Sequence, residues 1–171
     1  VKRALKLGKN VICEKPLTDS FEKTQELFDL AIKYKCKLHE VCMYTHHKQY
    51  EYLKALVEKL NDEIKTVHVK FSIPHLEKND IRYQKEFGGG ALLDVGYYPI
   101  SIIVNLFGMP RSIQSIKTSE YGYDVDLLGS SILEYNSFFC IAEWGIGVPY
   151  SNKLTIESSD RSFTFSRIFS K

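Results

Sequence analysis

The sequence predicts an α+β domain with a large, mostly antiparallel open sheet and helices on one face, preceded by the last βαβ elements of a parallel α/β domain. Residues 1–43 show helix, strand, helix and strand patterns in turn, and a strand–helix–strand crossover pairs its two strands in parallel. From residue 64 the apolar period changes to two, and most later patterns are short strands. We therefore divide the chain into 1–43, the end of the α/β domain, and 44–171, the sheet domain.

The first segment begins with "VKRALKLGKN", which has the form of the last turns of a helix closed by Gly8. Residues 11–13 (Val-Ile-Cys) form an apolar run that we interpret as the end of a buried strand. A helix follows Asp19, which together with Glu22 has the spacing of a capping box. The stretch "KLHEVCMY" is the second strand, so the segment reads as a βαβ unit.

The second segment opens with a helix whose core face has the spacing i, i+3, i+4 and i+7: Leu53, Leu56, Val57 and Leu60. In "IKTVHVKFSIP", apolar Val67 and Val69 lie on one face and polar residues on the other, as in a half-solvated antiparallel strand. The stretch "FGGGALLDVGYYPISIIVNLFGMP" predicts a helix from about Ala91 to Gly108. Five strand patterns complete the chain: "SIQSIKTSE", "SSILEY", "FFCIAEW", "KLTIESS" and "SFTFSRI".

Composition excludes several classes of partner. The chain has 44% hydrophobic and 26% charged residues, as globular proteins do, and its formal net charge of +2 favours neither a nucleic acid nor an anionic membrane. No apolar run approaches the roughly 18–20 residues that span a bilayer, and there is no signal peptide, so we expect a cytoplasmic protein without a membrane partner. The four cysteines form no CxxC pair and are interpreted as buried thiols.

Lys15 stands directly after the first apolar strand, where ligands of open α/β sheets bind. A partly desolvated ammonium there suits a donor of a proton or hydrogen bond to a carbonyl oxygen. Pro16 would direct the exit from the strand, and an X-Pro bond can be cis. A surface lysine in a loop is the alternative that the spacing leaves open.

Asp94 and Tyr98 are four residues apart and share a face of the predicted helix. Tyr98 could protonate an alkoxide while Asp94 holds a substrate hydroxyl. Gly96 and Pro99 both weaken a helix, by roughly 1 and 3 kcal/mol relative to alanine. Such departures often accompany function, although a simple kink over the sheet remains open as the alternative.

Two further patterns in the sequence do not indicate a functional site. The glycines at 88–90 lack the GxGxxG or GxxxxGK[ST] pattern of a phosphate loop, so we expect them to let the chain enter a helix close to a ligand or a sheet. The five histidines show no HxxxH or HExxH spacing, and we expect no metal site.

Together, "GKNVICEKPLT" and "GGGALLDVGYYPISII" resemble the glucose-fructose oxidoreductase / inositol dehydrogenase / rhizopine catabolism (Gfo/Idh/MocA) family. The E-K-P element at the end of a Rossmann strand is one signature, and the glycine-rich entry to D-x-G-x-[H/Y] is the second. The resemblance covers the whole chain in order. It departs where many members have M-x-R-[FY], because this chain has Met43-Tyr44-Thr45-His46.

The resemblance implies an N-terminal Rossmann domain, an α+β sheet domain often used for homo-oligomers, and hydride transfer between NAD or NADP and a sugar or cyclitol carbon. It implies that Glu14, Lys15 and Pro16 contact the cofactor. It implies that Lys15, Asp94 and Tyr98 are catalytic, with Tyr98 the proton donor in reduction and Lys15 polarising the carbonyl or assisting the tyrosine. The substrate would be a sugar, and a nucleotide-linked ketosugar is one candidate.

The glycine-rich dinucleotide turn is absent, so roughly 80–90 residues of such a Rossmann domain are expected outside this chain, and the chain alone is expected to be inactive. Its two ends also have the form of cut elements, which predicts a fragment. A non-catalytic binding or oligomerisation domain that uses the open sheet is one alternative. A dihydrodiol dehydrogenase-like enzyme is another.

Overall fold

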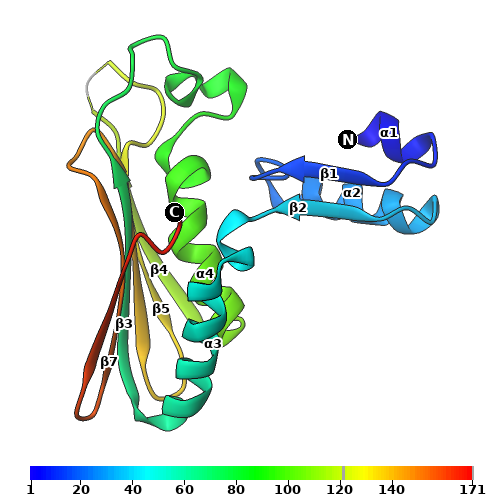
Figure 1. Ribbon diagram of the computed structural model, residues 1–171. Coiled ribbons are helices and arrows are strands. Elements are labelled where there is room, and N and C mark those ends of the chain that lie inside the picture. Colours follow the sequence, from blue (N-terminus) through cyan, green and yellow to red (C-terminus); the bar gives the residue numbers. More distant parts are fainter. Residues whose placement is uncertain (121, 171) are drawn as a thin grey trace. The chain divides into compact units, whose positions relative to one another are not determined.

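The computed structural model describes residues 1–120 and 122–170, and the chain divides into two compact units, Val1–Cys42 and Met43–Lys171. Figure 1 shows the first unit as short helices on a pair of strands and the second as a broad sheet with helices. Each unit is described by itself.

The first unit contains α1 (Lys2–Lys6), β1 (Val11–Glu14), α2 (Phe21–Lys33) and β2 (Leu38–Val41). β1 and β2 pair in parallel, as the βαβ pattern predicts, with Cys13 opposite Glu40. Four buried residues form its core: Leu5, Leu17, Leu27 and Ala31. The prediction that residues 11–13 are all buried is wrong for Ile12, which is 76% exposed because alternate residues of a strand point to opposite faces.

The N-terminus of α2 is capped by Ser20, whose side chain accepts a hydrogen bond from the Lys23 backbone N–H at 3.3 Å. The predicted capping box at Asp19 and Glu22 is therefore wrong. Asp19 lies one residue before the cap, and its carboxylate pairs with the Lys23 ammonium instead.

The second unit begins with η1 (Met43–His46), α3 (Lys48–Leu60) and η2 (Asn61–Glu63). β3 (Ile64–Ile73) is followed by the short turns η3 (Ile81–Tyr83) and η4 (Lys85–Phe87), the π-helical turn η5 (Leu92–Gly96) and helix α4 (Tyr97–Phe107). The remaining strands are β4 (Ser112–Thr118), β5 (Leu128–Glu134), β6 (Phe139–Ile146), β7 (Ser151–Ser158) and β8 (Ser162–Ser166).

The six strands form one sheet in the order β4-β5-β6-β3-β7-β8. Four of the five neighbouring pairs are antiparallel and the β3–β6 pair is parallel, which confirms the predicted mostly antiparallel sheet. Figure 1 shows α3 and α4 along the same face of this sheet. Side chains of β3, β6 and β7 that point to this face are buried: Val67, Val69, Cys140, Ala142, Trp144, Leu154 and Ile156.

Trp144 connects the helical layer to the sheet, and two glycines make room for its indole. A Cβ atom added to Gly96 in η5 would lie 2.9 Å from Trp144 Cδ2, and one added to Gly129 in β5 would lie 2.3 Å from Trp144 Cζ2. Packing against Trp144 therefore explains why residue 96 is a glycine, Gly96. Pro99 lies three residues after the end of the π-helical turn η5, where the helical winding changes.

The helical run Lys85–Phe107 is long and apolar enough to cross a membrane by length and composition alone, with a mean hydropathy of 1.4. The prediction that no run approaches this length is thus too strict. In the structure the run is divided into η4, η5 and α4, and α4 contacts β3 and β6 as a core helix does.

Candidate active site

Lys15 follows the last residue of β1 and is half-buried, at the carboxyl end of a parallel strand pair. The Lys15–Pro16 peptide bond is cis. The next backbone N–H, that of Leu17, donates to Glu40 Oε1 at 2.5 Å, so the end of β2 holds the chain just after the lysine. Glu14 itself is exposed. The E-K-P element is therefore an ordered turn at the edge where α/β sheets bind ligands.

Asp94 lies on the π-helical turn η5, in contact with an arginine that the sequence analysis does not single out. Arg82 Nε donates to Asp94 Oδ2 at 2.5 Å, and Arg82 Nη1 donates to Asp80 Oδ1 at 3.2 Å. Burial lowers the pKa of Arg82, but hydrogen bonds and charges from Asp94 and Asp80 outweigh it and raise the pKa above its ordinary value. One guanidinium thus holds two carboxylates.

The glycine run at 88–90 allows this arrangement. A Cβ atom on Gly89 would lie 2.7 Å from the carbonyl oxygens of Arg82 and Gln84, and one on Gly90 would lie 2.7 Å from Asp126 Oδ1. The Gly90 N–H donates to the Arg82 carbonyl at 2.8 Å, and the Leu92 N–H donates to Asp126 Oδ2 at 2.8 Å. The run lets the chain enter a helix, as expected, but the close neighbours are the backbone of Arg82 and Gln84 and the Asp126 side chain, not a strand of the sheet.

Tyr98, in the first turn of α4, is 8% exposed. Its ring packs edge-on against Phe71 at a centroid distance of 5.2 Å and lies 5.4 Å from the ring of Phe169. β3 and the C-terminal residues thus fix the orientation of the phenol. Asp94 and Tyr98 belong to one continuous helical run, but they have different neighbours, because η5 and α4 are wound differently.

Behind Tyr98, α4 is anchored by Tyr44, which is fully buried. Asn105 Nδ2 donates to the Tyr44 hydroxyl at 2.8 Å, and the Ser101 hydroxyl lies 3.1 Å from the same oxygen. Ser101 also donates to the Tyr98 carbonyl at 3.1 Å. Tyr44 lies in the segment where the sequence departs from the family pattern, and here it braces the helix that carries Tyr98.

The predicted site residues fall in the two units: Glu14, Lys15 and Pro16 in the first, Asp94 and Tyr98 in the second. Sequence reasoning misses two residues: Arg82, which contacts Asp94, and Glu40, which contacts the backbone beside Lys15. Only the Asp80-x-Arg82 spacing gives a hint, because Asp80 Oδ1 accepts the Arg82 N–H at 2.9 Å. Within residues 1–120 and 122–170, no three His, Cys, Asp or Glu side chains gather as metal ligands would.

Two family models match the chain. Residues 1–44 match a model described as "Oxidoreductase family, NAD-binding Rossmann fold", and residues 50–164 match one described as "GFO/IDH/MocA C-terminal domain". The two matches follow each other in chain order and together contain all five predicted site residues.

Curated relatives are similar along most of the chain. A dTDP-3,4-didehydro-2,6-dideoxy-alpha-D-glucose 3-reductase from Streptomyces violaceoruber is 32% identical over 172 residues, which is 98% of this chain and 50% of that protein. A D-xylose 1-dehydrogenase (NADP(+)) 2 from Haloferax volcanii is 33% identical over 138 residues, covering 80% of this chain and 42% of that protein. The chain spans about half the length of the first of these relatives.

A solved structure is similar over nearly the whole chain. KijD10, a 3-ketoreductase from Actinomadura kijaniata in complex with NADP and TDP-benzene, matches with a TM-score of 0.91 and 30% identity. The match covers 99% of this chain and 53% of that one.

Proposed function

This chain belongs to the GFO/IDH/MocA family of oxidoreductases, and from that premise we propose that it forms part of an NAD(P)-dependent enzyme that reduces a sugar carbonyl. The proposed substrate class is a nucleotide-linked ketosugar. The observation that carries the proposal is the family match over residues 1–44 and 50–164, which includes Lys15 in one model and Asp94 and Tyr98 in the other. The similarity to a dTDP-3,4-didehydro-2,6-dideoxy-alpha-D-glucose 3-reductase supports the substrate class, and the similarity to a 3-ketoreductase solved with NADP and TDP-benzene supports the cofactor.

The residues present fit a nicotinamide cofactor. Lys15 lies beyond the carboxyl end of a parallel strand, where dinucleotides bind in α/β sheets, and it brings a positive charge to that edge. Glu14, Lys15 and Pro16 would make this chain's share of the cofactor contacts. The bound dinucleotide supplies the hydride that reduces the substrate carbon.

In reduction, Tyr98 donates its hydroxyl proton to the carbonyl oxygen as that oxygen gains negative charge, and a proton from solvent then restores the phenol. Lys15 donates a hydrogen bond that polarises the same carbonyl. Asp94 accepts a hydrogen bond from a substrate hydroxyl, and Arg82 holds its carboxylate in place. In the reverse direction Tyr98 accepts the proton of the alcohol.

Turnover by the natural full-length protein tests this proposal. NADH and NADPH oxidation is followed with a panel of free ketosugars and their nucleotide-linked forms, and reduction of one nucleotide-linked ketosugar is expected. Tyr98→Phe should lower kcat by roughly 10²- to 10⁴-fold, the usual contribution of general acid catalysis. Tyr52→Phe, at a tyrosine that is 62% exposed on α3, is the matched control. Unchanged kcat in Tyr98→Phe would reject the role given to that phenol.

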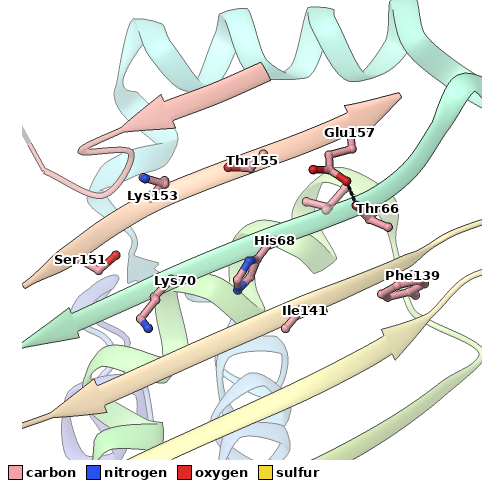
Figure 2. Close-up of a pocket in the computed structure, with 10 residues that line it drawn as sticks. Thr66, His68, Lys70, Phe139, Ile141, Ser151, Lys153, Thr155 and Glu157 are labelled. Atoms are coloured by element: carbon pink, nitrogen blue, oxygen red, sulfur yellow. Dashed lines mark hydrogen bonds between the residues drawn. The ribbon is translucent and has the colours of Figure 1, made fainter. Parts of the chain in front are cut away.

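We also propose that the sheet face opposite α3 and α4, here called the open face, joins two copies of the protein. Figure 2 shows side chains of this face from β3, β6 and β7. These side chains line a hollow of about 500 Å³. Lys70 and Lys153 are directly opposite in the β3–β7 register, and like charges in that position are destabilising. Glu143 lies opposite Lys70 in the β3–β6 register and contacts His68, and Glu157 accepts a hydrogen bond from Thr66. The open face therefore carries charges of both signs, which a second copy packed face to face would meet with the same set.

The open-face proposal is tested by sedimentation velocity of the full-length protein. Ile141→Glu adds a charge to the lining of the hollow and should weaken a dimer at least tenfold. Ile113→Glu, at an exposed isoleucine of β4 whose side chain points to the opposite face, should leave the dimer intact. A monomeric wild-type protein, or equal effects of both variants, would contradict the proposal. Dimers without any turnover would favour a purely binding role for the sheet.

A further inference from the structure

Glu40 places a carboxylate on the core face of β2. It lies opposite Cys13 in the parallel register, and residues paired in this way share a face of the sheet. Cys13, together with Val11 and Leu38, packs against the core of the first unit. A carboxylate on an apolar face must find hydrogen-bond donors, because leaving it unpaired away from water is costly.

One donor to this carboxylate is a backbone amide beside Lys15. Leu17 N donates to Glu40 Oε1 at 2.5 Å, within the short range of hydrogen bonds to a carboxylate. Pro16 has no N–H, so Leu17 carries the first backbone donor after Lys15. The Leu17 side chain is only 9% exposed and belongs to the core, which fixes the turn from its other side.

We propose that Glu40 is a positioning residue for Lys15. By holding the Leu17 amide, its carboxylate fixes the backbone two residues beyond the lysine and so sets the direction in which the ammonium points. Glu14 is exposed and alternates with Cys13 along β1, so it points away from the face that Glu40 shares. The inference rests on the proposed role of Lys15 in carbonyl reduction.

The test compares Glu40→Ala, Glu40→Gln and Lys15→Ala in the full-length protein, with NADPH and the best ketosugar substrate of the panel. Glu40→Ala is expected to lower kcat by roughly tenfold to a hundredfold, the usual cost of a misplaced catalytic group. Glu40→Gln keeps an acceptor oxygen at the same reach and should recover kcat to within a few-fold of wild type. Glu22→Gln, at an exposed glutamate in the first turn of α2, controls for loss of charge in this unit.

A second measurement follows the hydrogen bond itself. In ¹H–¹⁵N spectra the Leu17 amide proton should move upfield and exchange faster with solvent in Glu40→Ala, and much less so in Glu40→Gln. Should the alanine variant fail to fold, Glu40→Asp takes its place, since it draws the carboxylate back by one methylene.

The outcomes separate the two proposals. If Lys15→Ala abolishes turnover but a folded Glu40→Ala keeps wild-type kcat while Leu17 exchanges faster, the positioning inference is overturned and the proposed function stands. If Lys15→Ala leaves turnover unchanged, the role of Lys15 and its positioning both fail. Equal loss of kcat in Glu40→Ala and Glu40→Gln would also overturn the inference, because an acceptor at the same place should then have sufficed.

Discussion

Arg82 donates a hydrogen bond from Nε to Asp94 Oδ2 at 2.5 Å, and the same guanidinium contacts Asp80. The contact joins the turn at η3 to the π-helical turn at η5, twelve residues later. It supplies Asp94 with a fixed donor on one side, so the orientation of the Asp94 carboxylate is set before any substrate binds.

Replacing Arg82 should therefore impair catalysis through Asp94. If Asp94 holds a substrate hydroxyl as proposed, Arg82→Ala is expected to lower kcat/KM about tenfold or more, because the loosened carboxylate would no longer keep that hydroxyl in one place. Arg82→Lys keeps the charge but loses the planar fork and should have an intermediate effect. Steady-state kinetics of the full-length protein measure both. Arg111→Ala, at an exposed arginine before β4, is the control, and wild-type kinetics in Arg82→Ala would refute the prediction.

Gly96→Ala offers a test in which two effects have opposite signs. Helix propensity alone predicts a gain of roughly 1 kcal/mol. The added methyl, however, would lie 2.9 Å from Trp144 Cγ and Cδ2, and overpacking of this kind costs about 1–3 kcal/mol. We expect the protein to lose stability in urea denaturation.

Trp144→Ala supplies the control for the Gly96 prediction. Once the indole is removed, the closest remaining atom is Leu92 Cδ1 at 3.3 Å, the end of a flexible side chain, so Gly96→Ala should become close to neutral or stabilising in that background. A double-mutant cycle measures this coupling between the two positions. Simple additivity would show that Trp144 is not the reason for the glycine.

Tyr44→Phe should destabilise the protein by about 0.5–1.5 kcal/mol, the net contribution of a typical hydrogen bond, because Asn105 is exposed and Ser101 keeps its bond to the Tyr98 carbonyl. The hydroxyl that it removes accepts from Asn105 Nδ2 at 2.8 Å and lies 3.1 Å from the Ser101 hydroxyl. Tyr52→Phe, at an exposed position of α3, should change stability little. Chemical denaturation of the two variants side by side decides the matter, and equal stabilities would argue against an anchoring role for Tyr44.

Asp80 should stabilise the fold in a pH-dependent way. The hydrogen bond from the Arg82 backbone N–H is the largest cause of its lowered pKa, and contact with the Arg82 guanidinium adds to it. A carboxyl with a lowered pKa in the folded state contributes stability above its unfolded pKa, near 4, and loses it as the pH falls through the folded value. Asp80→Asn should therefore melt below wild type at pH 6, with a smaller difference at pH 3.

The matched control for Asp80 is Asp124→Asn, at an exposed aspartate of the loop before β5. It should leave the melting temperature unchanged at both pH values. A constant difference between Asp80→Asn and wild type from pH 6 to pH 3 would show that the charge of Asp80 contributes nothing.

Much of this fold could be read from local patterns. The alternation of Val67 and Val69 with polar residues predicts β3, and the apolar spacing from Leu53 to Leu60 predicts α3. The E-K-P element and the glycine-rich entry to Asp94 identify the family, because both motifs are contiguous in sequence. Periods of two and 3.6 residues follow from backbone geometry, so a single segment is enough to show them.

Contacts between distant segments could not be predicted from the sequence and are shown only by the tertiary structure. The parallel pairing of β3 with β6, the indole of Trp144 between Gly96 and Gly129, and the salt bridge from Arg82 to Asp94 all join residues whose own neighbours in sequence give no sign of the partner. At such places the space and the charge contributed by another element determine which side chain fits. The sequence by itself determined the family, the order of the elements and the three residues proposed to handle a carbonyl. The three-dimensional packing decided what holds Asp94, Tyr98 and the turn after Lys15 in place, because these supports exist only when the chain is folded.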